Sequence, residues 1–319
     1  MGYLNTFGFD EDYFNDLLLT ILEEDESLKQ YPTMKADLIK LCLENGKRIR
    51  PLFLLLSASL GDCKKELMYQ VAVGVEFLHV SSLIHDDIID DASLRRGVQT
   101  LHTTYDSYIA LHLGNYLLNK SMSLFSIIES KEAHVVLARA MSYLCLGEFK
   151  QAHQQFNFEL SEADYFEKSF EKTGMLLSTS LVLGGILSDL SVETLELLDE
   201  LGRDIGIAYQ LLDDISDFVE EDTTALKSTK TDLKNGVITL PTIYALSDDV
   251  LKDDILMLNS DVDDSHFMSV YDKIKASDCL TKSQQTCDLY IKQAYEKVSR
   301  LPKHQPLFSG LISALVSRH

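Results

Sequence analysis

Apolar residues recur at intervals of three and four along most of the chain, which is the spacing of one face of an α-helix. This pattern predicts helices over residues 10–30, 33–44, 47–60, 65–91, 105–129, 132–156, 162–188, 191–221, 237–247, 250–258, 265–276, 281–299 and 305–317. No segment alternates apolar and polar residues in the way that a half-buried strand requires. The sequence therefore predicts an all-α protein.

Two of the predicted helices are apolar around much of their circumference, over Leu67–Asp91 and Thr173–Leu187. Helices of this kind must lie inside a bundle and not across its surface. No break in composition and no repeat of fixed period divides the chain. We therefore expect one domain over residues 1–319, built as a single large helical bundle. A capping box is predicted where Ser161 precedes Asp164 at the start of a helix.

Composition and charge exclude several classes of function. The chain has 50 acidic and 29 basic residues, a net charge of −21, whereas nucleic-acid binders and electrostatic binders of anionic membranes present basic surfaces. The five cysteines are scattered and lack zinc-site spacing, which indicates reduced thiols in a cytoplasmic protein. The N-terminus has no signal-peptide pattern, and the apolar run over residues 51–60 is shorter than a bilayer span. We expect no transmembrane segment.

Two clusters of aspartates share the spacing DDxxD near the ends of long apolar helices: Asp86, Asp87 and Asp90, and Asp213, Asp214 and Asp217. Residues four apart share a helix face, so the outer two carboxylates of each cluster lie together. Their mutual repulsion, at the negative end of the helix dipole, favours a bound cation. Ligand sets made only of oxygen indicate magnesium or manganese. A solvated acidic face would explain one such cluster equally well, but the repeated spacing favours a metal.

Basic residues are few and gather near these clusters. GKRIRP (46–51) holds three cations, Arg95 and Arg96 follow the first cluster, and three lysines follow the second: Lys227, Lys230 and Lys234. Arg95, considered by itself, is explained better by a salt bridge to a nearby carboxylate. Together, arginines, lysines and a divalent metal are suited to holding two phosphorylated groups. Neither GxxxxGK[ST] nor GxGxxG is present, so the sequence does not indicate nucleotide chemistry.

These motifs, in their order and spacing, resemble those of the trans-isoprenyl (polyprenyl) diphosphate synthases over roughly residues 38–301. Within that family the likeness is greatest to the catalytic subunits of heptaprenyl diphosphate synthases. The resemblance rests on GKRIRP (46–51), HDDIIDDASLRRG (85–97), GEFKQ (147–151), KTG (172–174), YQLLDDISDF (209–218) and GVITLP (236–241). It implies an isoprenoid-synthase bundle with a central active-site cavity. It also implies magnesium-dependent, head-to-tail condensation of an allylic diphosphate, of geranyl or farnesyl type, with isopentenyl diphosphate.

The resemblance further implies a role for each motif residue. A trinuclear magnesium site, open also to manganese, would be held by Asp86, Asp90, Asp213, Asp214 and Asp217, with Asp87 alongside. The allylic diphosphate would be gripped by Arg95, Lys172 and Lys227. Isopentenyl diphosphate would be held by Gly46, Lys47, Arg50, His79 and Arg96. For His79, a packed structural role is the open alternative. The reaction centre would be lined by Thr173 and Gln210. The family also implies a homodimer and, in some members, a small regulatory subunit.

Product length is expected to depend on the residues just before the first cluster. In this family the product grows beside that helix, and the positions five and four before Asp86 are Ser81 and Ser82. Two serines leave this level open, so we expect a product longer than geranylgeranyl diphosphate. A farnesyl or geranylgeranyl product is the alternative. In that case Leu78 or Val75 would narrow the tunnel that holds the growing chain.

Several positions depart from the family pattern. Asn115 follows Gly114 where aspartate is frequent, Leu226 precedes Lys227, and Val237 stands where some members have lysine. The last twenty residues match weakly. The competing enzyme, a class I terpene cyclase, would need Ser or Thr where Asp217 stands and binds no second diphosphate. The competing non-catalytic subunit would have lost its aspartate clusters, which are intact here.

Overall fold

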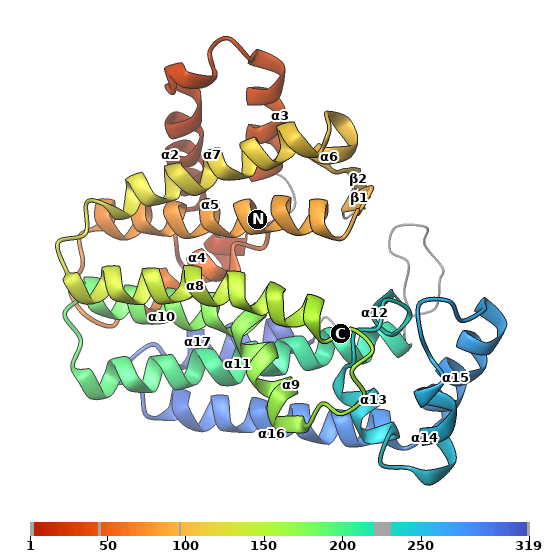
Figure 1. Cartoon of the computed structure of the whole chain (residues 1–319). Coiled ribbons are helices and arrows are strands. Elements are labelled where there is room, and N and C mark those ends of the chain that lie inside the picture. Colours follow the sequence, from red (N-terminus) through yellow and green to blue (C-terminus); the bar gives the residue numbers. More distant parts are fainter. Residues whose placement is uncertain (1–2, 44–45, 96, 220–230, 318–319) are drawn as a thin grey trace. The chain divides into compact units, whose positions relative to one another are not determined.

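The computed structural model describes residues 3–43, 46–95, 97–219 and 231–317. In the described chain, helices dominate and the β-structure is an antiparallel pair of short strands, β1 (Leu94–Arg95) and β2 (Val98–Gln99) (Figure 1). The all-α prediction is confirmed. The chain divides into two compact units, Met1–Leu137 with Thr179–Leu198 (unit 1) and Ala138–Ser178 with Asp199–His319 (unit 2). The expectation of one domain over residues 1–319 stays a prediction.

Unit 1 is organised around one long helix. Its elements, apart from segments of helices shared with unit 2, are α1 (Tyr3–Thr6), α2 (Glu11–Glu23), η1 (Glu26–Leu28), α3 (Pro32–Leu43), α4 (Ile49–Ala58), α5 (Lys65–Ile89), β1, β2, α6 (Leu101–Thr104) and α7 (Ser107–Phe125). α5 lies along α7 for much of its length (Figure 1). Most of α5 is buried, including Phe77 at 0% exposure, so the prediction of a central helix here is confirmed.

The same helix, α5, is long and apolar enough to span a membrane by length and composition. Its most apolar window is 67% buried inside the protein, which suits a helix at the centre of unit 1. The expectation that the chain has no transmembrane segment stays a prediction.

Aspartate caps change the bounds of two helices that the apolar spacing predicts. The predicted helix 10–30 ends at Glu23, because Asp25 accepts a hydrogen bond from the Ser27 amide and begins a separate turn, η1. The predicted helix 105–129 begins instead at Ser107, where Asp106 accepts from the Ile109 amide. Aspartate caps of this kind satisfy amide groups that have no partner in the first turn of a helix.

Unit 2 is an assembly of helices with its own buried core. Its elements are α9 (Glu162–Ser169), the π-helical segment η2 (Phe170–Gly174), α12 (Thr231–Lys234), α13 (Leu240–Ala245), α14 (Asp249–Leu256), α15 (Asp264–Ala276), α16 (Cys279–Ser299) and α17 (Gln305–Val316). Three helices contain residues of both units: α8 (Lys131–His153), α10 (Met175–Leu187) and α11 (Val192–Val219). The capping box of Ser161 and Asp164 begins α9 as predicted.

Glycines allow an unusually close approach of two backbones in unit 2. A Cβ atom at Gly206 of α11 would lie 2.1 Å from the Gly174 Cα atom, and one at Gly202 would lie 2.3 Å from the Ser178 Cα atom. No side chain fits at such distances, so these positions require glycine. The contact brings the end of η2 directly against α11.

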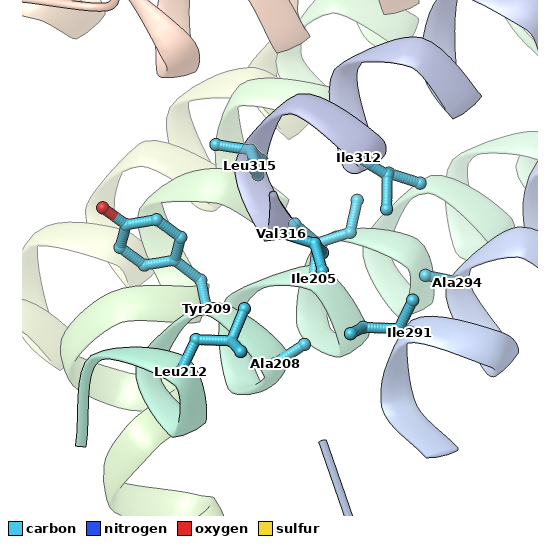
Figure 2. Close-up of a pocket in the computed structure, with 9 residues that line it drawn as sticks. All are labelled: Ile205, Ala208, Tyr209, Leu212, Ile291, Ala294, Ile312, Leu315 and Val316. Atoms are coloured by element: carbon cyan, nitrogen blue, oxygen red, sulfur yellow. The ribbon is translucent and has the colours of Figure 1, made fainter. Parts of the chain in front are cut away.

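An apolar pocket lies between α11, α16 and α17 of unit 2 (Figure 2). It is lined by Ile205, Ala208, Tyr209, Leu212, Ile291, Ala294, Ile312, Leu315 and Val316. The C-terminal helix α17 supplies three of these side chains. Within the weakly matching C-terminal segment, α17 therefore packs beside the helix that carries the second aspartate cluster.

The close contact at Gly206 predicts a large effect of a small substitution. Gly206→Ala places a methyl group against the Gly174 backbone, and overpacking of this kind costs about 1–3 kcal/mol of unfolding free energy or more. The midpoint of thermal unfolding should fall by several degrees. The control is Gly147→Ala in α8, where the nearest atom would lie at an ordinary 3.4 Å. Because alanine favours helix more than glycine, this variant should be neutral or stabilised. Equal midpoints for the two variants would contradict the close contact.

Candidate functional site

The first aspartate cluster ends α5, and its middle carboxylate points inward. Asp87 is 7% exposed, and its Oδ1 accepts a hydrogen bond of 2.6 Å from the Nε of Arg95. Burial raises the pKa of the Asp87 carboxyl, and the Arg95 charge opposes this rise. Asp86 is partly exposed and Asp90, the C-cap of α5, is exposed. The structure therefore separates the outer pair from a buried, charge-paired aspartate, and Arg95 forms the salt bridge that was its simplest interpretation.

The second cluster, on α11, repeats this arrangement. Asp214 is 3% exposed and accepts hydrogen bonds from the Tyr165 hydroxyl at 2.6 Å and from Nε2 of Gln210 at 2.8 Å. Burial, with a contribution from Asp232, raises the pKa of Asp214 to about 7. Asp213 and Asp217 are partly exposed. Each cluster thus presents two carboxylates four residues apart and keeps the third inside.

Gln210 connects this buried aspartate to Thr173. The Thr173 hydroxyl donates to Oε1 of Gln210 at 2.5 Å, while the amide nitrogen of Gln210 donates to Asp214. Because Asp214 accepts from the amide nitrogen of Gln210, the amide oxygen faces Thr173. The close approach of Gly174 and Gly206 brings these side chains within reach. Two residues predicted to line a reaction centre are therefore neighbours.

The π-helical segment η2 carries Lys172 and is held by α8. Lys172 Nζ lies 2.8 Å from Oε1 of Gln151 and 3.2 Å from Oε1 of Glu148. A second ion pair has its lysine on α8 and its carboxylate on η2: Lys150 Nζ lies 2.7 Å from Oε1 of the buried Glu171. Isolated π-helical turns frequently occur at functional sites. The motif GEFKQ (147–151) thus positions Lys172, a role that sequence reasoning did not assign to its members.

The N-terminal basic motif contacts α5 within unit 1. Nη1 of Arg50 lies 3.1 Å from Nε2 of His79, which joins two residues that the family resemblance assigns to the same substrate. Lys47 is partly buried and Gly46 is exposed. Arg48, between them, is 5% exposed and ion-paired to Glu76.

The two serines before the first cluster differ in their surroundings. Ser81 is 2% exposed, and its hydroxyl donates to the Gly114 carbonyl of α7 at 2.8 Å. Ser82 is partly exposed, and its hydroxyl donates to the His79 carbonyl of its own helix. The sequence does not distinguish the two positions, because the partner of Ser81 belongs to another helix.

Some predicted residues lie outside the described part of the chain: Arg96, Leu226, Lys227 and Lys230. Lys234 lies at the surface, where it pairs with Asp264 at 2.7 Å. The Val237 amide donates to the Asp232 carbonyl. Within the described ranges no three His, Cys, Asp or Glu side chains are arranged to share one ion. The outer aspartate pairs nevertheless offer the oxygen donors, on accessible helix ends, that magnesium requires.

Comparison with known proteins identifies similar chains. A sequence model described as polyprenyl synthetase matches residues 32–274. Heptaprenyl diphosphate synthase component 2 of Bacillus subtilis is 34% identical over 91% of this chain and 84% of its own length. The crystal structure of heptaprenyl diphosphate synthase from Staphylococcus aureus has a TM-score of 0.90 at 29% identity, covering 99% and 98% of the two chains. The polyprenyl synthase from Caulobacter crescentus CB15, complexed with calcium and isoprenyl diphosphate, has a TM-score of 0.87 at 25% identity, covering 99% and 97%.

The buried hydrogen bond of Tyr165 predicts a stability difference between two tyrosines of unit 2. Tyr165→Phe removes the donor to Asp214 and leaves a buried carboxylate oxygen without it, which costs about 1–3 kcal/mol. The control, Tyr244→Phe, removes a hydroxyl that bonds the exposed Glu162 and the partly exposed Thr286, and it should cost less than about 1 kcal/mol. Urea unfolding midpoints compare the two variants. A Tyr165 variant as stable as the Tyr244 variant would show that the Asp214 contact is unimportant to the fold.

Proposed function

Because the chain belongs to the polyprenyl synthetase family, it is a prenyltransferase that elongates trans-polyprenyl diphosphates, and we propose how its residues divide this task. The observation that supports the division best is the shared design of the two aspartate clusters. In each, an accessible pair of carboxylates lies four residues apart while the middle aspartate is buried and hydrogen-bonded. The outer pairs would hold magnesium, and the middle aspartates would orient their neighbours.

The metal ligands of this proposal are Asp86, Asp90, Asp213 and Asp217. Bound magnesium would stabilise the negative charge that develops on the allylic diphosphate as its carbon–oxygen bond ionises. The oxygen-only donor set and the calcium named in the complex of the Caulobacter crescentus relative support a divalent cation at these residues. Asp87 and Asp214 are assigned a positioning role because their side chains are buried and hydrogen-bonded, Asp87 to Arg95 and Asp214 to Tyr165 and Gln210. For Asp214 this role replaces the metal-ligand role that the family resemblance implies.

The substrate-holding residues follow from their neighbours. Lys172 would bind the allylic diphosphate, because Glu148 and Gln151 of α8 hold its ammonium group in place. Thr173 and Gln210, whose hydrogen bond is oriented by Asp214, would line the reaction centre. Lys47, Arg50 and His79 would bind isopentenyl diphosphate through the basic cluster at the start of α4.

Product length and partners also belong to the proposal. We assign a product longer than geranylgeranyl diphosphate, supported by the small side chains before Asp86 and by two relatives named for heptaprenyl products. The name "component 2" supports a second kind of subunit for this chain. Exposed apolar side chains also support contact with a protein partner, whether a second copy or a smaller subunit: Tyr108 and Leu111 on α7, and Leu146 and Phe149 on α8.

The metal assignment predicts that Asp86→Ala and Asp213→Ala each abolish turnover. Both variants should keep helical circular dichroism, because removing one of several repelling carboxylates costs the fold little. Consumption of isopentenyl diphosphate is measured against magnesium concentration, with Asp253→Ala of the exposed face of α14 as control. Activity within about tenfold of wild type, a barrier change of only ~1.4 kcal/mol, would contradict the assignment. If the wild-type protein consumes the allylic substrate but not isopentenyl diphosphate, it is a cyclase.

The serine positions predict a shift in product length. Phenylalanine at Ser81 or Ser82 should shorten the product toward farnesyl or geranylgeranyl diphosphate, as judged by chromatography of the dephosphorylated product. Ser81→Phe should also lower the unfolding midpoint, because the ring must displace the Gly114 backbone, whereas Ser82→Phe should not. The control is Ser81→Ala, which adds no volume and should leave the product unchanged. Unchanged products in both phenylalanine variants would mean that the chain does not grow along this face of α5.

A further inference from the structure

The basic motif GKRIRP contains one cation that the proposed function does not use. Arg48 lies between Lys47 and Arg50, yet its side chain is 4% exposed and turned into unit 1. Its Nη1 lies 2.5 Å from Oε1 of Glu76 on α5, whose side chain is 5% exposed. Its Nη2 donates to the Cys42 carbonyl at 2.5 Å, at the end of α3. Arg48 therefore joins two helices and presents no charge to solvent.

The surroundings of this ion pair are closed on each described side. The Arg48 guanidinium carbon lies 5.6 Å from the ring centroid of Phe14, from α2. A Cβ atom at Gly46 would lie 2.8 Å from Nη1 of Arg48 and 3.3 Å from Oε1 of Glu76. The glycine of the motif thus lies directly over the pair. A side chain there would have to displace the guanidinium group.

The backbone at Arg48 is strained in a way that the ion pair maintains. Its φ angle is +49°, in the left-handed region that residues other than glycine seldom adopt. Such strain persists where surrounding contacts over-determine the conformation, and it gathers at functional sites. A buried ion pair adds little net stability, because the loss of hydration offsets the attraction between the charges. Its best-attested use is to impose one arrangement on its neighbours.

A second contact, one turn along α5, repeats the connection. Glu76 and His79 are three residues apart and so share a face of α5. Glu76 binds Arg48, and Nε2 of His79 lies 3.1 Å from Nη1 of Arg50. Two successive turns of α5 therefore hold two arginines of the same motif. The position of the motif on the helix is set at both points.

We propose that Arg48 and Glu76 form a positioning pair for isopentenyl diphosphate, an inference that rests on the proposed function of Lys47 and Arg50. The pair fixes residues 46–50 against α5, so that Lys47 and Arg50 bind the same diphosphate with little loss of conformational freedom. Arg48 itself makes no contact with substrate. Loss of the pair should weaken binding of isopentenyl diphosphate and spare the allylic substrate.

The test is a comparison of KM values for the two substrates in Glu76→Gln, which keeps the shape of the side chain and removes its charge. KM for isopentenyl diphosphate should rise about tenfold, while KM for the allylic substrate and kcat at saturation change less than about twofold. Arg48→Lys, which keeps the charge but loses the fork that reaches both Glu76 and Cys42, should give a smaller rise of the same selectivity. It serves as the readout if Glu76→Gln does not fold.

The matched control breaks another, largely buried ion pair of the chain. In unit 2, Lys297 Nζ lies 2.5 Å from Oδ2 of Asp204, with side chains 16% and 8% exposed. Asp204→Asn should lower thermal stability as Glu76→Gln does, but it should leave KM for isopentenyl diphosphate unchanged. A similar KM rise in this control, or equal changes for both substrates in Glu76→Gln, would overturn the positioning role.

Two further variants separate this inference from the function on which it rests. Lys47→Ala and Arg50→Ala should each raise KM for isopentenyl diphosphate. If neither does, the proposed substrate site is wrong, whatever Glu76→Gln shows. If both do and Glu76→Gln and Arg48→Lys do not, the site stands and the positioning pair is refuted.

Discussion

A buried carboxylate must be met by hydrogen-bond donors or by an opposite charge, and this constraint governs both aspartate clusters. Asp87 is met by Arg95, and Asp214 by Tyr165 and Gln210. The residues one before and three after the middle aspartate both project to the same side of it, by roughly 100° and 60°, and both remain partly or fully exposed. The metal-binding capacity assigned to each cluster therefore depends on the donors that hold its middle member.

Close packing between helices positions the polar side chains of these motifs. The contact of Gly174 with Gly206 brings the end of η2 against α11, which puts Thr173 beside Gln210. Gly147 of α8 lies beside the Lys172 backbone at an ordinary contact distance, and the neighbouring Glu148 and Gln151 hold the lysine ammonium group. In unit 1, Gly46 lies over the Arg48–Glu76 pair. Each glycine lies beside a hydrogen bond or ion pair, so the small residues of these motifs leave room for the polar contacts.

Much of the fold could be predicted because helical periodicity is a local property of the chain. The central position of α5, the DDxxD pairs and the capping box at Ser161 follow from spacing alone. Helix ends at Asp25 and Asp106 were missed, because an aspartate cap competes with apolar periodicity that continues through it.

Other features depend on partners far along the chain and could not be predicted from one sequence. Arg48 pairs with Glu76, which is 28 residues away in the sequence, and Lys172 bonds Gln151, which is 21 residues away. The same limit applies to Ser81 and Ser82, which look equivalent in the sequence. They differ because the Ser81 hydroxyl bonds Gly114, which belongs to another helix. The spacing of small residues, Gly174 with Ser178 and Gly202 with Gly206, was the available signal for the crossing at η2.

The central claim is that the outer aspartates bind metal and the middle ones position their neighbours. Its most direct test is manganese binding, measured by electron paramagnetic resonance with inorganic diphosphate present, in single Asp→Asn variants of both clusters. The account predicts that Asp86→Asn and Asp213→Asn weaken manganese binding by about tenfold or more, while Asp87→Asn and Asp214→Asn retain it within a few-fold. Equal losses at the middle and outer positions would contradict the account.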